Sequence, residues 1–395
     1  MKKTIKDIDV KGKRVIVRCD FNVPLDTAGE ISDYIRITSA IPTIKYLIEH
    51  KAKVILISHL GRPDGLPNME FTLKPVAEEL AKLLDMNIDF VSSPRVVDDN
   101  VRSAVAKMEE GQVILLENVR FRKEETEDDP EFSKELASLG DIFVEDAFGA
   151  AHRAHASIYG IAKYLPGVSG FLLEREVKFL GNAVDNPLRP FLAIMGGAKI
   201  GDKILVIERL LDLVDSLIIG GGMAYTFIKA TGHEIGKSLV EEDKLDLALR
   251  LIQKAKDKNV KLLLPIDVIA AREFSNVVDF TSVDADKIPK DMMGLDIGKG
   301  SIKLFVEEIE KSETILWNGP MGVFEMSNFA EGTFKIAQAM SVSKGITIIG
   351  GGDSAAAVLQ FGLSDKMTHI STGGGASLEF IGGKELPGIS ILEDK

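Results

Sequence analysis

Cysteine is almost missing from this chain of 395 residues, and its single cysteine, Cys19, excludes an internal disulfide and a thiolate metal site. Long apolar runs are missing too, since none approaches the roughly 18 residues that a membrane-spanning helix needs. The N-terminal stretch MKKTIKDIDVKGKR has no apolar core, so we do not expect a signal peptide. These absences predict a cytoplasmic protein that neither enters a membrane nor carries disulfides.

Positive charge is the third deficit. The chain has 48 Lys and Arg against 60 Asp and Glu, which gives a net charge of −12. An acidic surface repels nucleic acid, and no block of basic residues offsets it, so we expect no nucleic acid partner. Against this background, basic residues that gather at the ends of predicted strands indicate a negatively charged ligand.

Short β-branched runs alternate with amphipathic helical patterns, which predicts an α/β fold. This alternation is typical of parallel sheets with helices on both faces, and the length favours two domains with separate cores. One helical pattern runs through Leu73, Val76 and Leu80, and Thr72 is placed to cap its N-terminus. Strands are expected near residues 15–17, 54–57, 88–91, 113–116, 142–144, 191–195, 217–219, 261–264, 314–317, 346–349 and 368–370, and further helices at 244–256 and 329–340.

A helical segment is expected to join the two halves of the chain. Residues 171–184, FLLEREVKFLGNAV, carry apolar side chains at helical spacing, and the following DNPLRP ends the pattern with two prolines. We therefore predict a first domain at 1–170, a connecting helix at 171–185 and a second domain at 186–378.

In the second half, the predicted strands run into glycine clusters. Glycine has no Cβ to keep the backbone away from phosphate oxygens, and a turn that enters a helix presents free N–H groups and a positive dipole end. Repeated clusters of this kind predict a nucleotide site. They are GGAK at 196–199, GGG at 220–222, NGPMG at 318–322, GGGDS at 350–354 and STGGGAS at 371–377.

Charged residues beside these clusters fit the same ligand. Lys199 and Lys203 are four residues apart, so on a helix they share one face and point into a phosphate site. Asp353 follows three glycines and is suited to hold Mg²⁺ on nucleotide phosphates, although a helix N-cap is the alternative role. Glu325 is placed to accept hydrogen bonds from ribose hydroxyls.

The standard phosphate-loop motifs do not fit. Residues 232–238, GHEIGKS, resemble a Walker A loop but have three intervening residues where four are needed, and they follow a helical pattern instead of a strand. Residues 350–355 match a dinucleotide fingerprint only with Ala355 in place of its third glycine.

In the first half, the predicted strands run into basic residues. An arginine fork makes paired, charge-assisted bonds to phosphate or carboxylate, so several converging arginines predict a ligand with more than one negative charge. Asp20 and Asn22 add partners for a hydroxyl group. The basic residues are Arg36, His59, Arg62, Arg120, Arg122, His152, Arg153 and His155.

Motifs of other chemistries are missing from this half. It has no nucleophile elbow, no H-E-x-x-H or Cys/His metal pattern and no glutamate pair suited to glycoside hydrolysis. A basic site together with a nucleotide site predicts direct phosphoryl transfer, which depends on positioning and charge neutralisation.

Over essentially its whole length, the chain resembles the phosphoglycerate kinase family, which interconverts 1,3-bisphosphoglycerate and MgADP with 3-phosphoglycerate and MgATP. The motifs that carry this resemblance occur in the family's order. They are RCDFNVP at 18–24, SHLGRP at 58–63, ENVRF at 117–121, AHRAHAS at 151–157, GGAK at 196–199, WNGPMGVFE at 317–325, GGGDS at 350–354 and STGGGASLE at 371–379.

The resemblance implies a role for individual residues. It implies that phosphoglycerate is held by Asp20, Phe21, Asn22, Arg36, His59, Leu60, Gly61, Arg62, Arg120 and Arg153. It implies that the nucleotide is held by Gly196, Gly197, Lys199, Lys203, Gly294, Asn318, Glu325, Gly351, Gly352, Asp353 and Ser354, with Asp353 on Mg²⁺. The transferring phosphoryl group would be stabilised by Arg36, Lys203 and the glycine N–H groups near Gly350 and Gly373.

The resemblance also implies an architecture of two Rossmann-like domains joined by an interdomain helix and a deep cleft, in a monomer. Residues 379–395 would pack back on the first domain. There is one local departure, since Lys299 stands where the family usually has proline, and we expect it to alter one helix start near the adenine edge and Gly294.

Two other functions remain open from the residues alone. A dehydrogenase dependent on NAD is suggested by residues 350–355, and a non-catalytic nucleotide or anion binder would use either site without the other. A binder has no need for both an arginine cluster and a carboxylate suited to Mg²⁺.

Overall fold

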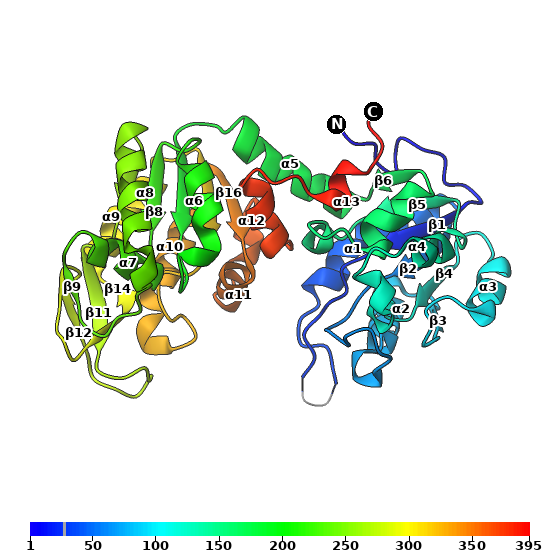
Figure 1. The fold of residues 1–395 in the computed structure, drawn as a ribbon, viewed down its shortest axis with the longest axis horizontal. Coiled ribbons are helices and arrows are strands. Elements are labelled where there is room, and N and C mark those ends of the chain that lie inside the picture. The colour runs from blue at the N-terminus through cyan, green and yellow to red at the C-terminus, as the bar shows by residue number, and fades with distance from the viewer. Residues whose placement is uncertain (27–28) are drawn as a thin grey trace. The chain divides into compact units, whose positions relative to one another are not determined.

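The computed structural model describes residues 1–26 and 29–395, apart from the side chain of Asp202. It consists of two compact units, which we call unit 1 (Met1–Lys178 and Glu385–Lys395) and unit 2 (Phe179–Lys384). The division falls within helix α5 (Phe171–Asp185), which is labelled in Figure 1. Among the described residues, no helix is long and apolar enough to cross a membrane.

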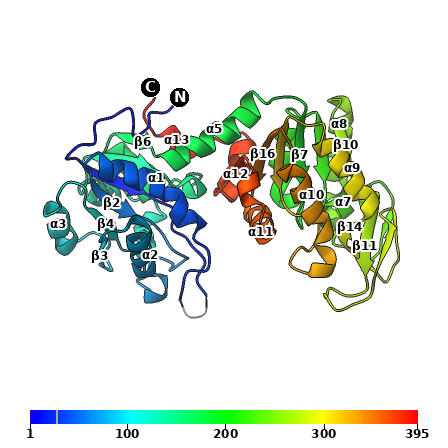
Figure 2. The ribbon, with the colours of Figure 1, turned by 180° about the vertical axis from the view of Figure 1, so that it is seen from behind.

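Unit 1 is built on a six-stranded parallel sheet with the strand order β3-β4-β2-β1-β5-β6. Val15 and Val17 of the central strand pack with Ile44 and Val76 of the helices, and Ile16, which points the other way, is equally buried. Helices therefore cover both faces, as a parallel sheet requires (Figures 1 and 2). The elements are β1 (Arg14–Arg18), α1 (Ile35–Glu49), β2 (Lys53–Ile57), α2 (Lys74–Leu84), β3 (Asp89–Val91), α3 (Asp99–Ala106), β4 (Val113–Leu116), α4 (Pro130–Ala137), β5 (Ile142–Glu145) and β6 (Gly167–Ser169).

Unit 2 repeats this design with a second six-stranded parallel sheet, ordered β10-β8-β7-β15-β16-β17. Its core joins Ile194 and Trp317 of the sheet to Phe305 and Ile336 of the helices. The sheet and its helices are β7 (Phe191–Met195), α6 (Ile204–Leu210), β8 (Ser216–Ile219), α7 (Met223–Ala230), α8 (Leu245–Asp257), β10 (Lys261–Leu263), α9 (Lys299–Ile309), β15 (Thr314–Asn318), α10 (Glu331–Ser341), β16 (Ile346–Gly350), α11 (Gly352–Gln360), β17 (His369–Ile370) and α12 (Gly375–Ile381).

Unit 2 also carries two small sheets that the sequence analysis missed. One is antiparallel, with the order β12-β11-β14, and the other pairs β13 with β9. Strand β12 is largely exposed, so it lacks the alternation of apolar and polar residues on which strand prediction depends. The bounds are β9 (Glu234–Ile235), β11 (Asp267–Ala271), β12 (Phe280–Asp284), β13 (Lys287–Ile288) and β14 (Met293–Ile297).

The C-terminal segment belongs to unit 1. Helix α13 (Pro387–Ser390) lies beside β6 in Figure 1, and the Gly388 N–H donates to the Ala151 carbonyl at 2.9 Å. The two chain ends also form an antiparallel bridge between Lys2 and Asp394.

The predicted strands all form, with each end within one residue of its expected place, because buried β-branched runs leave little freedom. The cap predicted at Thr72 is wrong by one position. Leu73 occupies the N-cap of α2, and its N–H donates to the Glu117 carboxylate at 3.0 Å. Thr72 is turned to donate its own hydroxyl to Glu117 at 2.8 Å.

Helix α9 begins at Lys299, so the lysine in the usual proline position is the first residue of the helix. The start is held by Asp267 of β11, whose carboxylate accepts from the N–H groups of Gly300 at 2.9 Å and Ser301 at 2.7 Å. A carboxylate at this position satisfies N–H groups that have no partner within the helix.

We expect Asp267→Ala to lower the free energy of unfolding by about 0.5–2 kcal/mol, because two N–H groups of the first turn lose their acceptor. Urea unfolding followed by far-UV circular dichroism measures this. Lys299→Pro is the matched control and should leave the midpoint unchanged or higher, since proline at the first helical position lacks only an unused N–H. Equal midpoints for the Asp267 variant and the parent protein would contradict the prediction.

Candidate active site

The predicted anion-binding residues of unit 1 meet at one edge of its sheet. Strands β4, β2, β1 and β5 are parallel neighbours, so their carboxyl ends lie side by side. Asp20 follows β1, His59 follows β2, Arg120 follows β4, and Arg153 follows β5 at a greater distance along the chain. Arg36 joins them from the first turn of α1.

Hydrogen bonds connect these residues to one another. Arg36 donates to the Asp20 carboxylate at 2.5 Å, and the Asp20 side chain is only 5% exposed. The Asn22 side chain accepts from the Gly61 N–H at 2.8 Å, and Arg120 donates to the Gly61 carbonyl at 2.8 Å. These bonds fix the loops that carry the predicted site residues relative to one another.

Two predicted residues, Phe21 and Leu60, have side chains in the core. Their backbone groups are also used, since the Phe21 N–H donates to Ser58 Oγ at 2.9 Å and the Leu60 carbonyl accepts from Asn118 at 2.7 Å. They shape the loops that carry Asp20 and His59.

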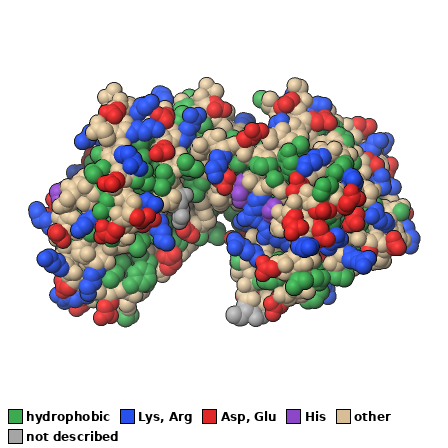
Figure 3. Space-filling model, in the orientation of Figure 1, with side chains coloured by type: hydrophobic (Ala, Val, Ile, Leu, Met, Phe, Trp, Pro, Cys, Tyr) green, Lys and Arg blue, Asp and Glu red, His purple; other side chains and the backbone are tan. Residues whose placement is uncertain are grey.

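A cavity of about 460 Å³ opens in unit 1. Of the predicted substrate residues, it is lined by Arg62, Arg120 and Arg153 but not by Asp20, Asn22, Arg36 or His59. In Figure 3, Lys, Arg and His side chains gather on this unit. Within the described chain, Arg62, Arg120 and Arg153 form no ion pair, whereas Arg122 is already paired with Glu124 at 3.0 Å. The cavity thus presents positive charge that unit 1 does not neutralise. Its lining is Arg62, Asp64, Gly65, Arg120, Arg122, Lys123, Thr126, Arg153 and His155.

This concentration of positive charge alters the ionisation of its members. Burial, with Arg153 and Arg18 nearby, lowers the pKa of Arg120 to about 10. Burial, with Arg18 and Arg120 nearby, holds the pKa of His59 well below its usual range. Burial, with Arg120 and Arg18 nearby, lowers the pKa of His155 to about 3. Both histidines are therefore neutral at physiological pH, and the arginines supply the charge.

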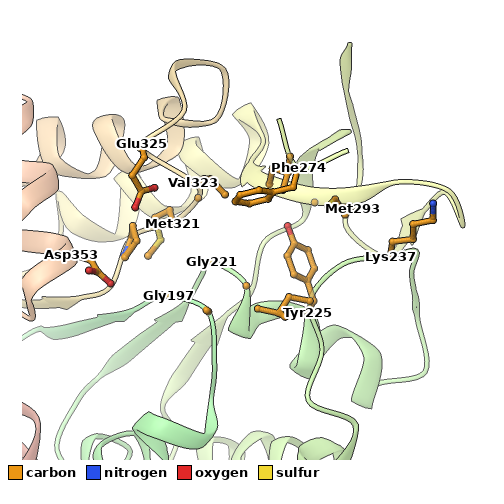
Figure 4. Close-up of a pocket in the computed structure, with 17 residues that line it drawn as sticks. Gly197, Gly221, Tyr225, Lys237, Phe274, Met293, Met321, Val323, Glu325 and Asp353 are labelled. Atoms are coloured by element: carbon orange, nitrogen blue, oxygen red, sulfur yellow. The ribbon is translucent and has the colours of Figure 1, made fainter. Parts of the chain in front are cut away.

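Unit 2 contains a second cavity, of about 470 Å³, at the carboxyl ends of its strands. Figure 4 shows Tyr225, Phe274 and Met293 together toward one end and Glu325 and Asp353 toward the other. The cavity therefore has an apolar end and an acidic end. Of the predicted nucleotide residues, it is lined by Gly197, Gly294, Glu325 and Asp353.

Glycine is required where two loops of this cavity touch. Gly319 has a φ of +97°, and a Cβ there would lie 2.2 Å from the Gly196 carbonyl oxygen. A Cβ on Gly196 would in turn lie 2.2 Å from the Pro320 carbonyl oxygen. The loops after β7 and β15 are thus joined backbone to backbone, with the Gly197 N–H donating to Pro320 at 3.0 Å.

Lys203 lies at this junction, but Lys199 does not share its helical face. The Lys203 ammonium donates to the carbonyls of Gly196 at 2.7 Å and Asn318 at 3.2 Å. The prediction of one helix for both lysines is wrong, because Lys199 is exposed in irregular backbone before the short helix η7 (Gly201–Lys203). The backbone there bonds elsewhere: Ile200 and Gly201 donate to the Glu241 carboxylate at 2.6 and 3.2 Å.

Asp353 is exposed in the first turn of α11 and lines the cavity. The N-cap of α11 is Gly351, so the alternative role of Asp353 as N-cap is wrong. Ser354 is buried and accepts from the Gly319 N–H at 2.6 Å. Its side chain therefore holds the loop after β15.

Gly350, Asn318 and Gly373 lie at the carboxyl ends of strands of the same sheet. Gly350 ends β16 and pairs with Asn318 in the sheet, and Gly373 follows β17, where its N–H donates to Ser371 at 3.1 Å. The described residues contain no group of three or more His, Cys, Asp or Glu that could hold a metal ion. A metal here would need ligands from a bound molecule in addition to Asp353.

The sequence analysis did not place the apolar end of this cavity. Tyr225, Leu239, Phe274 and Met293 have no motif of their own, and only the fold assembles them. Lys237 also lines the cavity, although it belongs to the GHEIGKS segment that was set aside. The GGG cluster at 220–222 was a usable signal, because Gly221 and Gly222 line the cavity directly.

An arginine-lined cavity at one parallel sheet and a glycine-lined cavity with a carboxylate at another define a phosphotransferase that uses a nucleotide and a small anion. Comparison with known proteins gives the family. The family model for phosphoglycerate kinase matches residues 5–384. The curated phosphoglycerate kinase of Clostridium tetani is 58% identical over 395 residues, which cover 100% of this chain and 98% of that protein.

Solved structures agree with this comparison. The phosphoglycerate kinase of Coxiella burnetii has a TM-score of 0.90 at 44% identity, covering 99% of this chain and 98% of that one. The enzyme of Pyrococcus horikoshii has a TM-score of 0.83 at 31% identity, with the same coverage. The chain belongs to the phosphoglycerate kinase family. It is therefore a phosphotransferase, and this assignment favours neither the dehydrogenase nor the non-catalytic binder.

The neutral histidines of unit 1 should make its stability depend on pH. The folded pKa of His155, about 3, lies below the unfolded value near 6.5. Between these values the unfolded chain binds a proton that the folded chain does not. Stability is therefore full above about pH 6.5 and is lost as the pH falls, by at most about 1.4 kcal/mol per pH unit for this group.

Buried Glu145 and Asp146 act in the opposite direction, since burial raises their pKa values to about 8 and about 7. The contribution of His155 is therefore isolated by comparing His155→Gln with the parent protein in urea unfolding at pH 7.5, 6 and 5. The parent should lose more stability than the variant on acidification. Parallel profiles would show that His155 is protonated in the folded state.

Proposed function

We propose that unit 1 binds phosphoglycerate and unit 2 binds the adenine nucleotide for reversible phosphoryl transfer between 1,3-bisphosphoglycerate and ADP. One observation carries the proposal: Arg62, Arg120 and Arg153 meet at a cavity without ion-pair partners among the described residues. A ligand with a phosphate and a carboxyl group supplies the missing negative charge. Asp20, Asn22, Arg36 and His59 complete the set that would contact it.

On unit 2, the division of the cavity supports a defined orientation of the nucleotide. The base would occupy the apolar end with Gly294, and Glu325 would accept from the ribose. The phosphates would lie at the glycine loops and the N-terminus of α11, where free N–H groups and the helix dipole favour negative charge.

Magnesium fits this arrangement. Mg²⁺ keeps several waters and is commonly held by one or two carboxylates together with substrate phosphates. Asp353 offers one exposed carboxylate at the acidic end of the cavity. When bound, the metal would neutralise charge on the phosphates.

The reaction needs no protein base. A phosphate oxygen of ADP attacks the phosphorus of the acyl phosphate, the bond to the carboxyl oxygen breaks, and a carboxylate leaves without a proton. Positioning and charge neutralisation are then sufficient. Arg36, Lys203 and the N–H groups near Gly350 and Gly373 would stabilise the charge on the transferring group.

In-line transfer requires the two ligands to touch, so we propose that units 1 and 2 close on one another during the cycle, with α5 as a hinge. Closure would also exclude water, which would otherwise accept the phosphoryl group. We further propose that the protein acts as a cytoplasmic monomer.

Arg36→Ala should lower kcat by about a thousandfold or more, because an arginine on the transferring phosphoryl group contributes that much. A coupled assay that follows ATP-dependent turnover of 3-phosphoglycerate measures it, and omission of Mg²⁺ tests the metal. Lys45→Ala, an exposed change on the same helix, is the matched control. Near-normal kcat in the Arg36 variant would remove Arg36 from the catalytic role.

Gly352→Ala should separate ligand binding from folding. A Cβ on Gly352 would meet no protein atom within 4 Å, so nothing in the fold requires glycine there. We expect unchanged or slightly higher stability, since alanine favours a helix, and a KM for ATP raised about tenfold or more because the methyl group occupies phosphate space. The KM for 3-phosphoglycerate should not change. An unaltered KM for ATP would place the phosphates elsewhere.

A further inference from the structure

Arg18 has no role in the proposed reaction. Arg18 is the last residue of β1 and only 1% exposed, and each of its three guanidinium nitrogens has a partner in the protein. Its guanidinium Nη2 lies 3.1 Å from Nδ1 of His59, which is 3% exposed. Arginine only donates hydrogen bonds, so Nδ1 of His59 must accept and cannot carry a proton.

The position of Arg18 is itself held from several sides. Its Nε donates to Ser157 Oγ at 2.8 Å, and its Nη1 donates to the Cys19 carbonyl. Ser157 donates its hydroxyl at 2.6 Å and its N–H at 2.9 Å to Glu125, which is fully buried. The buried chain Glu125–Ser157–Arg18 therefore ends on one particular nitrogen of His59.

We propose that Arg18 is a positioning residue that holds His59 as the neutral tautomer with its proton on Nε2, so that His59 offers the phosphoglycerate a hydrogen-bond donor that does not change with pH. The part of this that concerns the ligand rests on the proposed function of unit 1. Within the described chain, Nε2 of His59 makes no hydrogen bond, and it is the ring nitrogen left for a ligand oxygen.

The charges around the His59 ring also favour its neutral form. Arg18 comes from β1, Arg36 from α1, Arg120 from the short helix η2 (Val119–Phe121), and Arg153 from the segment beyond β5. All four oppose a positive charge on His59, and burial lowers its pKa further. The negative groups nearby are engaged with other partners, since Asp20 pairs with Arg36 and Glu125 accepts from Ser157.

The chain provides an internal reference for the measurement. Nδ1 of the exposed His50 lies 2.7 Å from the Tyr46 carbonyl oxygen, which only accepts. In His50 the proton must therefore lie on Nδ1, the opposite tautomer to His59.

The test is a long-range ¹H–¹⁵N spectrum of the histidine rings in the ligand-free protein from pH 5 to 8.5, with His59→Gln to assign the signals. We expect His59 to show an unprotonated Nδ1 and a protonated Nε2 over the whole range, while His50 shows a protonated Nδ1. A His59 ring that gains a second proton between pH 5.5 and 7.5, or that carries its proton on Nδ1, would overturn the proposal.

Two variants test whether Arg18 is the cause. Arg18→Lys keeps the charge but loses the fork, and Ser157→Ala keeps Arg18 but removes its anchor, so a failure of the first to fold leaves the second. In each we expect a mixed or titrating His59 signal and a KM for 3-phosphoglycerate raised about tenfold at pH 7.5, with kcat within about twofold. Arg14→Lys, on the same strand and paired with Asp141 at 2.6 Å, should change neither.

The outcomes separate the tautomer from the ligand role. An unchanged His59 signal in both variants would overturn the assignment to Arg18. The parent protein could show the expected His59 tautomer while His59→Gln has an unchanged KM for 3-phosphoglycerate. This would support the role of Arg18 but overturn that of His59 as a substrate contact. If the parent protein showed the expected His59 tautomer but did not turn over 3-phosphoglycerate, this would count against the proposed function alone.

Discussion

The two sites exist because parallel strands all end at the same edge of a sheet. In unit 1 the order β4-β2-β1-β5 places four strand ends side by side, and in unit 2 the order β8-β7-β15-β16-β17 does the same for five. The interior of each sheet is apolar on both faces, so the polar residues that follow the strands collect at that edge. Each unit then uses the edge in its own way.

In unit 1, the edge of the sheet presents charged side chains. Burial and the neighbouring arginines together lower the pKa of Arg120 to about 10 and hold that of His59 well below its usual range. Buried Arg18 bonds to His59 and, through Ser157, is linked to Glu125.

In unit 2, the edge of the sheet presents mainly backbone groups. The contact between the loops at Gly196 and Gly319 leaves no room for side chains, and Lys203 is bonded to the same carbonyls. Charge on a ligand there would be met by N–H groups, one lysine and the dipole of α11. This difference fits the proposed ligands, since phosphoglycerate would be recognised by its charges and the nucleotide also by its base.

Much of the fold and of the two candidate sites could be predicted from the sequence. The β-branched runs predicted every strand of the two large sheets except β6, because burial on both faces demands such residues and the three-residue edge strand β6, GVS, has no such run. The residues after the strands led to the proposal that the first half binds an anion and the second half a nucleotide. The small sheet of β11, β12 and β14 was not predicted. Its strand β12 is largely exposed and carries no alternation of apolar and polar residues. The apolar end of the nucleotide cavity was missed with it.

The remaining differences are local and have one cause. Lys199 lies outside any helix because Glu241, forty residues away in the chain, binds the backbone beside it at Ile200. Leu73 displaces Thr72 at the start of α2 because Glu117 binds its N–H. Local sequence thus determined the elements, the order of the sites and their chemical character. Which atom bonds to which, including the nitrogen of His59 that faces Arg18, was decided only by tertiary structure, because the deciding partners are distant in the chain.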